Sequence, residues 1–138
     1  MQSEGKIYMG PKEMNQLLLN WFPELKDAFE KETSWQEGLE TGATVTYEDV
    51  FMPFFIDGFI RGDKEFQNRL LSFVEELSKT PDEYCQNVVG LAILDDIQSY
   101  EMVKDKIVNF LLPESRKQYE AIIRDEKAAH IWLLIRVE

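Results

Sequence analysis

The chain holds few side chains that can do chemistry at neutral pH: one histidine, one cysteine and several pairs of acids. His130 is the only imidazole, the group that most often serves as a base or a metal ligand. It lies in an apolar tail beside Ile131 and Trp132, which favours packing over catalysis. Cys85 is expected on the apolar side of its helix, where cysteine behaves as a small hydrophobe. One histidine and one cysteine are too few for a structural zinc site.

Some of the acids are adjacent in the sequence, among them Glu48-Asp49, Glu75-Glu76, Asp82-Glu83 and Asp95-Asp96. Neighbours along a helix do not share a face, so each pair is expected at a solvated helix edge and not as a catalytic carboxylate dyad. The chain has no phosphate-binding glycine loop, no calcium-binding loop and no Glu-x-x-His pair for a helical di-iron site. The motifs thus favour binding, and no cofactor or metal is expected.

Prolines, glycines and polar residues divide the chain into segments of helical length, which indicates an all-α fold. The expected helices are Pro11–Trp21, a short one from Pro23, Tyr47–Ile60, Lys64–Lys79, Pro81–Ile97, Tyr100–Leu111 and a last one from Pro113. Short connections between them predict about seven helices in antiparallel hairpins, arranged as an irregular bundle or a short α-solenoid. A single helical domain over residues 1–138 is expected at this length.

Local signals predict where several helices begin and end. Thr46 and Thr80 are predicted N-caps, the second with proline at the first helical position and Glu83 at the third. Gly62 is predicted to end one helix, and Asp63 to cap the next. The helix that follows is amphipathic, with Glu75 on its predicted polar face.

Two segments lack a helical signal. Residues 33–46 hold two glycines and several threonines, and are predicted to form the longest loop, a kind of segment that often carries function. Residues 128–138 are rich in β-branched residues and predict a short terminal strand, which would pair with residues 6–9 or 44–46. Continuation of the last helix is the alternative for this tail.

Composition limits the choice of partners. The 138 residues are 44% hydrophobic, with 26 acids and 15 bases for a formal charge of −11. Residues 1–60 hold 11 acids and 4 bases, whereas residues 97–138 hold 7 of each. Such acidity repels nucleic acid and anionic membranes and attracts basic proteins, although acidity also serves solubility alone. A single cysteine, no signal peptide and no membrane-length apolar run predict a cytoplasmic protein.

Three stretches resemble a known family. They are Leu18–Lys26, Leu71–Leu77 with Asp82–Asp95, and Leu111–Lys117. Together they are similar to a family of small, uncharacterised, all-helical bacterial proteins that look like immunity proteins of polymorphic-toxin systems. The resemblance implies a helical fold and a toxin as partner, and it brings no catalytic residues. The chain departs from the family at Leu112, where members often have glycine, and along residues 33–46.

The expected function is therefore that of a non-catalytic cytoplasmic binding protein of the immunity type, with an acidic face against a basic protein. The predicted partner-binding residues are an aromatic anchor and the acids around it, with a second acidic pair: Trp35, Glu37, Glu40, Glu48, Asp49, Asp95 and Asp96. Exposed aromatics are frequent anchors of interfaces. Two alternatives stay open. One is a small hydrolase that uses scattered carboxylates, and the other is a helical adaptor that binds a peptide in an apolar groove.

Overall fold

The computed structural model describes residues 9–137, and the surroundings of side chains for residues 9–125; within these residues the fold is all-α, without strands. Three-residue to six-residue stretches of 3₁₀- or π-helix, labelled η, join or extend the α-helices. In chain order the elements are α1 (Pro11–Trp21), η1 (Pro23–Leu25), α2 (Lys26–Thr33), η2 (Gly38–Glu40), α3 (Ala43–Thr46), η3 (Tyr47–Phe51), α4 (Met52–Arg61), α5 (Lys64–Lys79), α6 (Glu83–Val88), η4 (Val89–Leu94), η5 (Asp96–Ser99), η6 (Ile107–Asn109) and α7 (Pro113–Val137).

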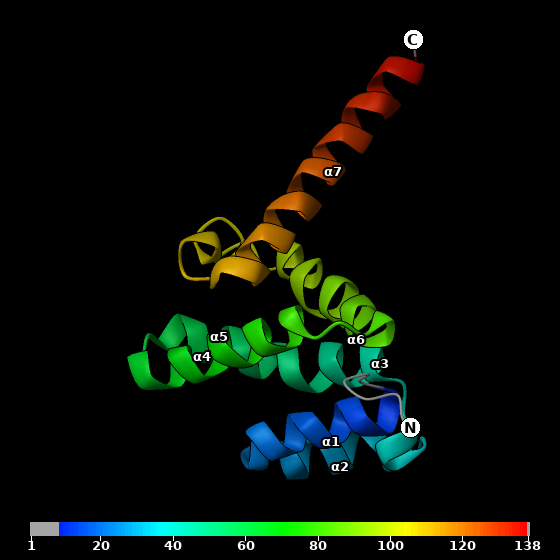
Figure 1. Cartoon of the computed structure of the whole chain (residues 1–138), viewed down its shortest axis with the longest axis vertical. Helices are drawn as coiled ribbons and strands as arrows, with labels where there is room; N and C mark the ends of the chain where they lie inside the picture. The colour runs from blue at the N-terminus through cyan, green and yellow to red at the C-terminus, as the bar shows by residue number, and fades with distance from the viewer. Residues whose placement is uncertain (1–8, 138) are drawn as a thin grey trace, which may run out of the picture.

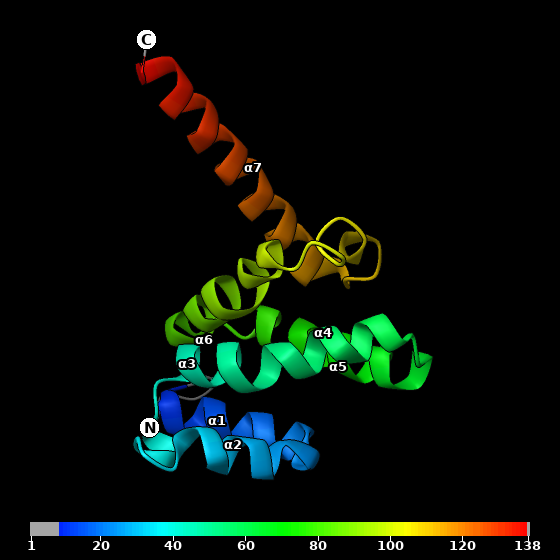
Figure 2. The same cartoon turned by 180° about the vertical axis from the view of Figure 1, so that it is seen from behind.

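The helices stack as pairs. Figures 1 and 2 show α1 and α2 side by side in one layer, α4 and α5 in the next, and α6 beyond them. The α3, η3 and α4 segments follow one another without a break, and so do α6 and η4. Helix α7 begins against α5 and η4, and its far end leads away from the rest of the molecule (Figures 1 and 2). The stacked hairpins agree with the arrangement that the short connections predict.

Several helix ends form where the sequence predicts them. Helix α1 begins at Pro11, and the N–H of Gly10 donates to the Glu13 carboxylate at 3.0 Å. Gly62 ends α4 with a left-handed φ of 76°, a conformation that glycine adopts without steric cost. Asp63 caps α5 by accepting a hydrogen bond from the N–H of Phe66 at 3.1 Å. These features need only local sequence.

An aromatic cluster holds the layers together. The Phe73 ring of α5 lies 5.2 Å from the ring of Phe22 and 5.3 Å from that of Phe51, centroid to centroid. The Tyr47 ring stacks on Phe73, and the Tyr47 hydroxyl donates to the carbonyl of Met14 at 2.8 Å. The side chains of all five residues, including Met14, are fully buried in the core. The contacts connect α1, η3 and α5, so this cluster sets how the first layer sits on the second.

The predicted terminal strand is wrong for the residues that the structure describes. Residues 128–137 continue α7 as a helix, and Thr44–Thr46 lies in α3. The other predicted partner, residues 6–9, lies outside the described residues except for Met9. Alternating β-branched residues cannot form a strand without a partner strand, so the helical alternative holds here.

Three further predictions need correction. Residues 33–46 are not one loop, because η2 and α3 form within them, and the third helical segment begins at Ala43 instead of Tyr47. Asp82 caps α6, accepting from the N–H of Cys85 at 2.9 Å, while the Thr80 hydroxyl donates to the backbone carbonyl of Glu76 in α5. Residues 100–111 form turns and the short η6 instead of a continuous helix.

Cys85 is fully buried, as its position on the apolar side of the helix predicts. Burial raises the pKa of its thiol to about 11, with the charge of Asp82 adding to the shift. The thiol is therefore protonated at neutral pH and unreactive. Among the described residues, no helix has the length and apolar character needed to cross a membrane.

Candidate partner-binding site

The structure brings together two of the acidic pairs that are far apart in the sequence. Glu48 and Asp49 lie in η3, and Asp95 and Asp96 lie where η4 passes into η5. These two π-helical segments pack against each other. We call the four carboxylates the acidic cluster. Glu48 and Asp49 are exposed, whereas Asp95 and Asp96 are half-buried.

Wide turns of the backbone carry both pairs. In η3 the N–H of Met52 donates to the carbonyl of Tyr47, and in η4 the N–H of Asp95 donates to the carbonyl of Gly90 at 2.9 Å. Such i→i+5 bonds add a residue to the turn and rotate the side chains that follow. π-Helical segments are rare and occur often at functional sites.

One hydrogen bond joins α6 to α3. The hydroxyl of Tyr84 in α6 accepts from the N–H of Ala43, the first residue of α3, at 3.0 Å. Tyr47 of η3 and Val89 of η4 are fully buried below. The packing of η3 on η4 brings the two acidic pairs close enough for the charge of Asp96 to act on Glu48.

The carboxylates of the acidic cluster lie close enough to repel one another. Burial raises the pKa of the Glu48 carboxyl, and the charges of Asp96 and Asp49 raise it further. Burial likewise raises the pKa of Asp96, with added contributions from Asp95 and Asp49. The nearby phenol of Tyr100 also has a raised pKa, first through burial and then through the charges of Asp96 and Glu48.

No cation of the described chain neutralises this charge. The ion pairs found among the described residues join Arg61 to Asp57, Arg69 to Glu24, Lys79 to Glu76 and Lys104 to Glu101, and none of them involves a residue of the cluster. Within the same residues no group of three or more Asp, Glu, Cys or His side chains is arranged to hold a metal ion. The cluster therefore offers unpaired carboxylates to an external cation.

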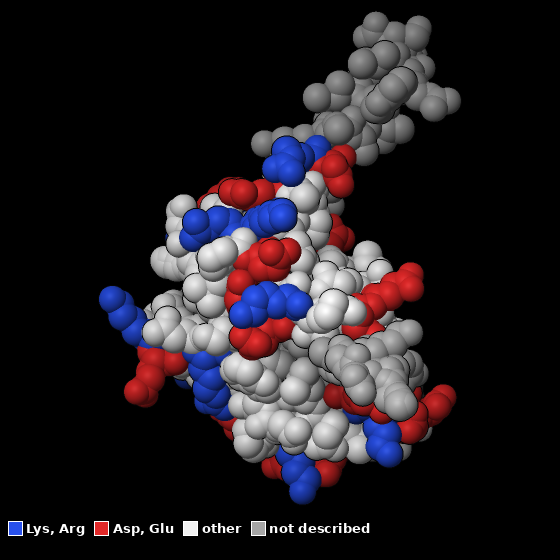
Figure 3. Space-filling view, viewed as in Figure 1, with Lys and Arg blue, Asp and Glu red and all other residues white. Residues whose placement is uncertain are grey.

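Surface charge elsewhere is mixed. On the face seen in Figure 3, acidic and basic side chains are interspersed along the body of the molecule. Alternating charges of this kind are typical of a solvated surface and steer no partner. The acidic cluster differs from such a mixed surface because its four charges have one sign and form no ion pair with a described residue.

The Trp35 segment forms a separate group. Trp35 lies in the turn after α2 with 79% of its surface exposed, and Glu37 and Glu40 are exposed beside it. This turn is anchored, because the Asn15 amide of α1 donates to the carbonyls of Leu39 and Thr41 at 2.9 and 2.8 Å. The adjoining η2 packs on α1 and α2, whereas the acidic cluster lies where η3 meets η4. The predicted site residues are therefore distributed over two places.

In two other adjacent acid pairs, one carboxylate accepts hydrogen bonds from N–H groups at the start of a helix. Glu75 is only 8% exposed, so its predicted position on a solvated face is wrong. Its carboxylate accepts hydrogen bonds from the N–H groups of Glu114 and Ser115, at 3.0 and 2.9 Å, and holds the first turn of α7 on α5. Asp82 serves as the cap of α6. Sequence spacing gave no sign of the Glu75 contact, because its partners lie about 40 residues away.

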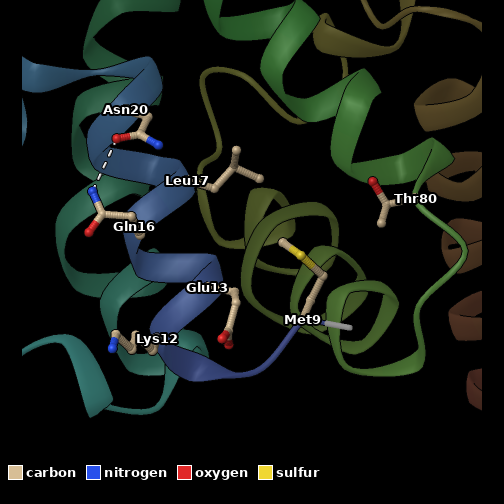
Figure 4. A pocket seen from close by; sticks show the side chains of 7 residues that line it. All are labelled: Met9, Lys12, Glu13, Gln16, Leu17, Asn20 and Thr80. Atoms are coloured by element: carbon tan, nitrogen blue, oxygen red, sulfur yellow. Dashed lines mark hydrogen bonds between the residues drawn. The ribbon is translucent and has the colours of Figure 1, made fainter. Parts of the chain in front are cut away.

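An open groove of about 470 Å³ runs along α1. Figure 4 shows Leu17 and Met9 at the space between α1 and Thr80, with the Gln16 amide hydrogen-bonded to Asn20 at 3.1 Å. Glu13 is the only carboxylate among the described residues that line it. Those residues therefore do not supply a pair of carboxylates for glycoside or ester hydrolysis. The side chain of His130 lies outside those that the structure describes.

Comparisons with known proteins place the chain in a family. A family model described as "Domain of unknown function (DUF7674)" matches residues 15–126, which include the acidic cluster, the Trp35 segment and the aromatic core. No curated protein and no solved structure matches the chain.

Proposed function

The chain belongs to the family described as DUF7674, and for this member we propose a non-catalytic role: it binds a basic protein through the acidic cluster. Residues Glu48, Asp49, Asp95 and Asp96 would face Lys or Arg side chains of the partner. Charge complementarity of this kind speeds association and sets specificity more than it adds affinity.

The unpaired, mutually repelling carboxylates are the observation that carries the proposal. The raised pKa values of Glu48 and Asp96 mean that each carboxylate is less stable in its charged form than an isolated carboxylate would be. A cation placed among them reverses this effect, because it stabilises all of the charges at once. In the free protein the carboxylates of the cluster only repel one another, and a bound basic surface would replace this repulsion by attraction.

The finer form of the proposal is an immunity protein whose partner is a toxin. Its support is the resemblance of the three stretches named above to immunity-type proteins, and the overall charge of −11. A stoichiometric inhibitor needs a complementary surface and no catalytic group. Under this proposal Trp35, with Glu37 and Glu40, provides a second contact region.

The test is capture of a partner from a lysate of the native host at low and at high salt, followed by mass spectrometry. The baits are the wild-type chain, the cluster variant Glu48→Gln/Asp96→Asn, and the control Glu30→Gln/Glu120→Gln, which removes two exposed acids elsewhere. We expect wild type and control to retain the same basic protein at low salt, with weaker retention at high salt. The cluster variant should lose it.

Equal retention by the cluster variant would exclude the acidic cluster as the binding surface. In that case a fourth bait, Glu37→Lys/Glu40→Lys, tests the Trp35 segment. Capture of no basic protein by any bait would refute the proposed function itself. Circular dichroism of every bait establishes that the substitutions leave the helices intact.

A further inference from the structure

A second groove lies beside the acidic cluster, between η4 and α7. It measures about 370 Å³, and Asp95 of the cluster is one of its lining residues. Asp125 of α7 lines the groove as well. The groove is therefore continuous with the cluster at Asp95, and a second carboxylate comes from α7.

The floor of the groove is apolar. Leu91 has 60% of its surface exposed, the largest exposure of a described leucine, and Ile122 of α7 is half-buried beside the core. Gly90 leaves bare backbone between them, since a Cβ atom built there meets nothing within 4 Å. A ligand with an aliphatic portion can thus approach the helix backbone closely.

The uncommitted polar atoms of the groove are mostly acceptors. The Nε2 atom of Gln86 donates to the carbonyls of Ser78 and Thr80, at 3.0 and 2.7 Å, which leaves Oε1 as its free polar atom. The carboxylates of Asp95 and Asp125 form no hydrogen bond or ion pair with described residues. Asn87, exposed at the edge, offers both a donor and an acceptor. A groove with mostly free acceptor oxygens suits a ligand group that has only hydrogen-bond donors.

We infer that this groove takes an arginine side chain from an exposed segment of the basic partner. The inference rests on the proposed function and adds the chemistry of its main contact. The methylene stem of the arginine would lie on Leu91 and Ile122, and the guanidinium would donate to the carboxylates of Asp95 and Asp125. Arginine suits this set better than lysine, because its rigid fork serves several acceptors and its weaker hydration suits an apolar floor.

The test uses the full chain and three blocked tripeptides that differ at the central residue: acetyl-Leu-Arg-Leu-amide, its lysine analogue and its citrulline analogue. Citrulline has nearly the shape of arginine but no charge. Titrations followed by ¹H–¹⁵N correlation spectra report both the dissociation constant and the residues affected. We expect the arginine peptide to shift the amides of Gly90, Leu91 and Ile122, and to bind at least about tenfold more tightly than the citrulline peptide.

Two variants locate the site. Gly90→Leu adds a side chain at a helical position whose Cβ meets no atom within 4 Å, and by occupying the groove it should abolish the shifts. Asp125→Asn should weaken the arginine peptide about threefold or more, because it removes one charged acceptor. The matched control is Glu120→Gln, an exposed acid of the same helix outside the groove. It should leave the affinity unchanged.

The inference is overturned if the citrulline or the lysine peptide binds as tightly as the arginine peptide, or if Gly90→Leu keeps the wild-type shifts. The peptide titrations are independent of the capture experiment with the Glu48→Gln/Asp96→Asn variant, because those two residues do not line this groove. The acidic cluster can therefore bind a basic protein while the arginine groove fails its test, and the two failures are told apart.

Discussion

Replacement of Glu75 by alanine is expected to detach the start of α7 from α5. The Glu75 carboxylate is 8% exposed and accepts from the N–H groups of Glu114 and Ser115, and from the Ser115 hydroxyl at 2.9 Å. The first N–H groups of a helix have no partner within the helix, so alanine leaves these donors without an acceptor at a largely buried site. The Ser115 hydroxyl keeps a second acceptor, the carbonyl of Leu112 at 3.1 Å.

The size of the effect follows from these contacts. A hydrogen bond to a charged group contributes about 1.5–3 kcal/mol, and a carboxylate at a helix N-terminus adds up to about 2 kcal/mol where it is partly buried. Because the contributions share one carboxylate and are not additive, we expect Glu75→Ala to lower the free energy of unfolding by about 3 kcal/mol. For a chain of this size the loss corresponds to a Tm decrease of roughly 10 °C.

Urea unfolding followed by circular dichroism measures this change. Glu75→Gln separates charge from shape, because it keeps an acceptor oxygen and the side-chain volume; it should lose about 1–2 kcal/mol. The control is Glu76→Ala, the neighbouring acid, whose ion pair with Lys79 at 3.3 Å is exposed to solvent. We expect it to change stability by less than about 0.5 kcal/mol. Equal midpoints for Glu75→Ala and Glu76→Ala would refute the reasoning.

Acid provides an independent check on Glu75. Burial alone would raise the pKa of this carboxyl, but the hydrogen bonds from Ser115 and Glu114 outweigh it, and the pKa lies below the ordinary value of 4.5. A lowered pKa in the folded state adds stability above pH 4.5, which is lost as the pH falls through the lowered value. The difference in stability between wild type and Glu75→Gln should therefore shrink below pH 4.5 and not grow.

Two further predictions concern the glycines and the acidic cluster. Gly58→Ala should destabilise the protein, because the new Cβ would overlap the Phe66 ring. The Cβ added by Gly90→Ala meets no atom within 4 Å, so this variant should stabilise its helix by roughly 0.5–1 kcal/mol in thermal unfolding. A gain in stability from both variants would contradict the packing at Gly58. Glu48→Gln should raise the Tm at pH 7, since its raised pKa means that the charged form costs stability there. The gain should disappear as the pH falls below the ordinary value of 4.5, where wild-type Glu48 is protonated in both states. A gain that persists at low pH would show that the charge of Glu48 is not its cause.

Short-range signals were sufficient for much of the fold. Pro11 starts α1, Gly62 ends α4 and Asp63 caps α5, because each depends on the conformational preference or the side chain of a single residue near the helix end. The apolar spacing of Lys64–Lys79 predicts the buried side of α5, and the same reasoning places Cys85 in the core. The all-α class follows from these segments together.

Where the sequence allowed two local structures, only the tertiary structure showed which one forms. Both Thr80 and Asp82 can cap a helix, and Asp82 does so because α5 continues to Lys79 and leaves Thr80 at its end. Val103, Ile107 and Leu111 have helical spacing, but consecutive turns bury them just as well. There the Tyr119 hydroxyl donates to the carbonyl of Lys104 at 2.7 Å, so that carbonyl is engaged by a side chain from α7.

The candidate site divides in the same way between sequence and structure. Sequence alone determined that the chain is acidic, that its acids come in pairs and that Trp35 stands in a polar segment. It could not determine that Glu48 and Asp49 meet Asp95 and Asp96, or that Glu75 is buried against α7. Those outcomes depend on how segments more than 35 residues apart in the chain pack together, such as η3 on η4 and α7 on α5. Spacing along one helix holds no information about the register of another.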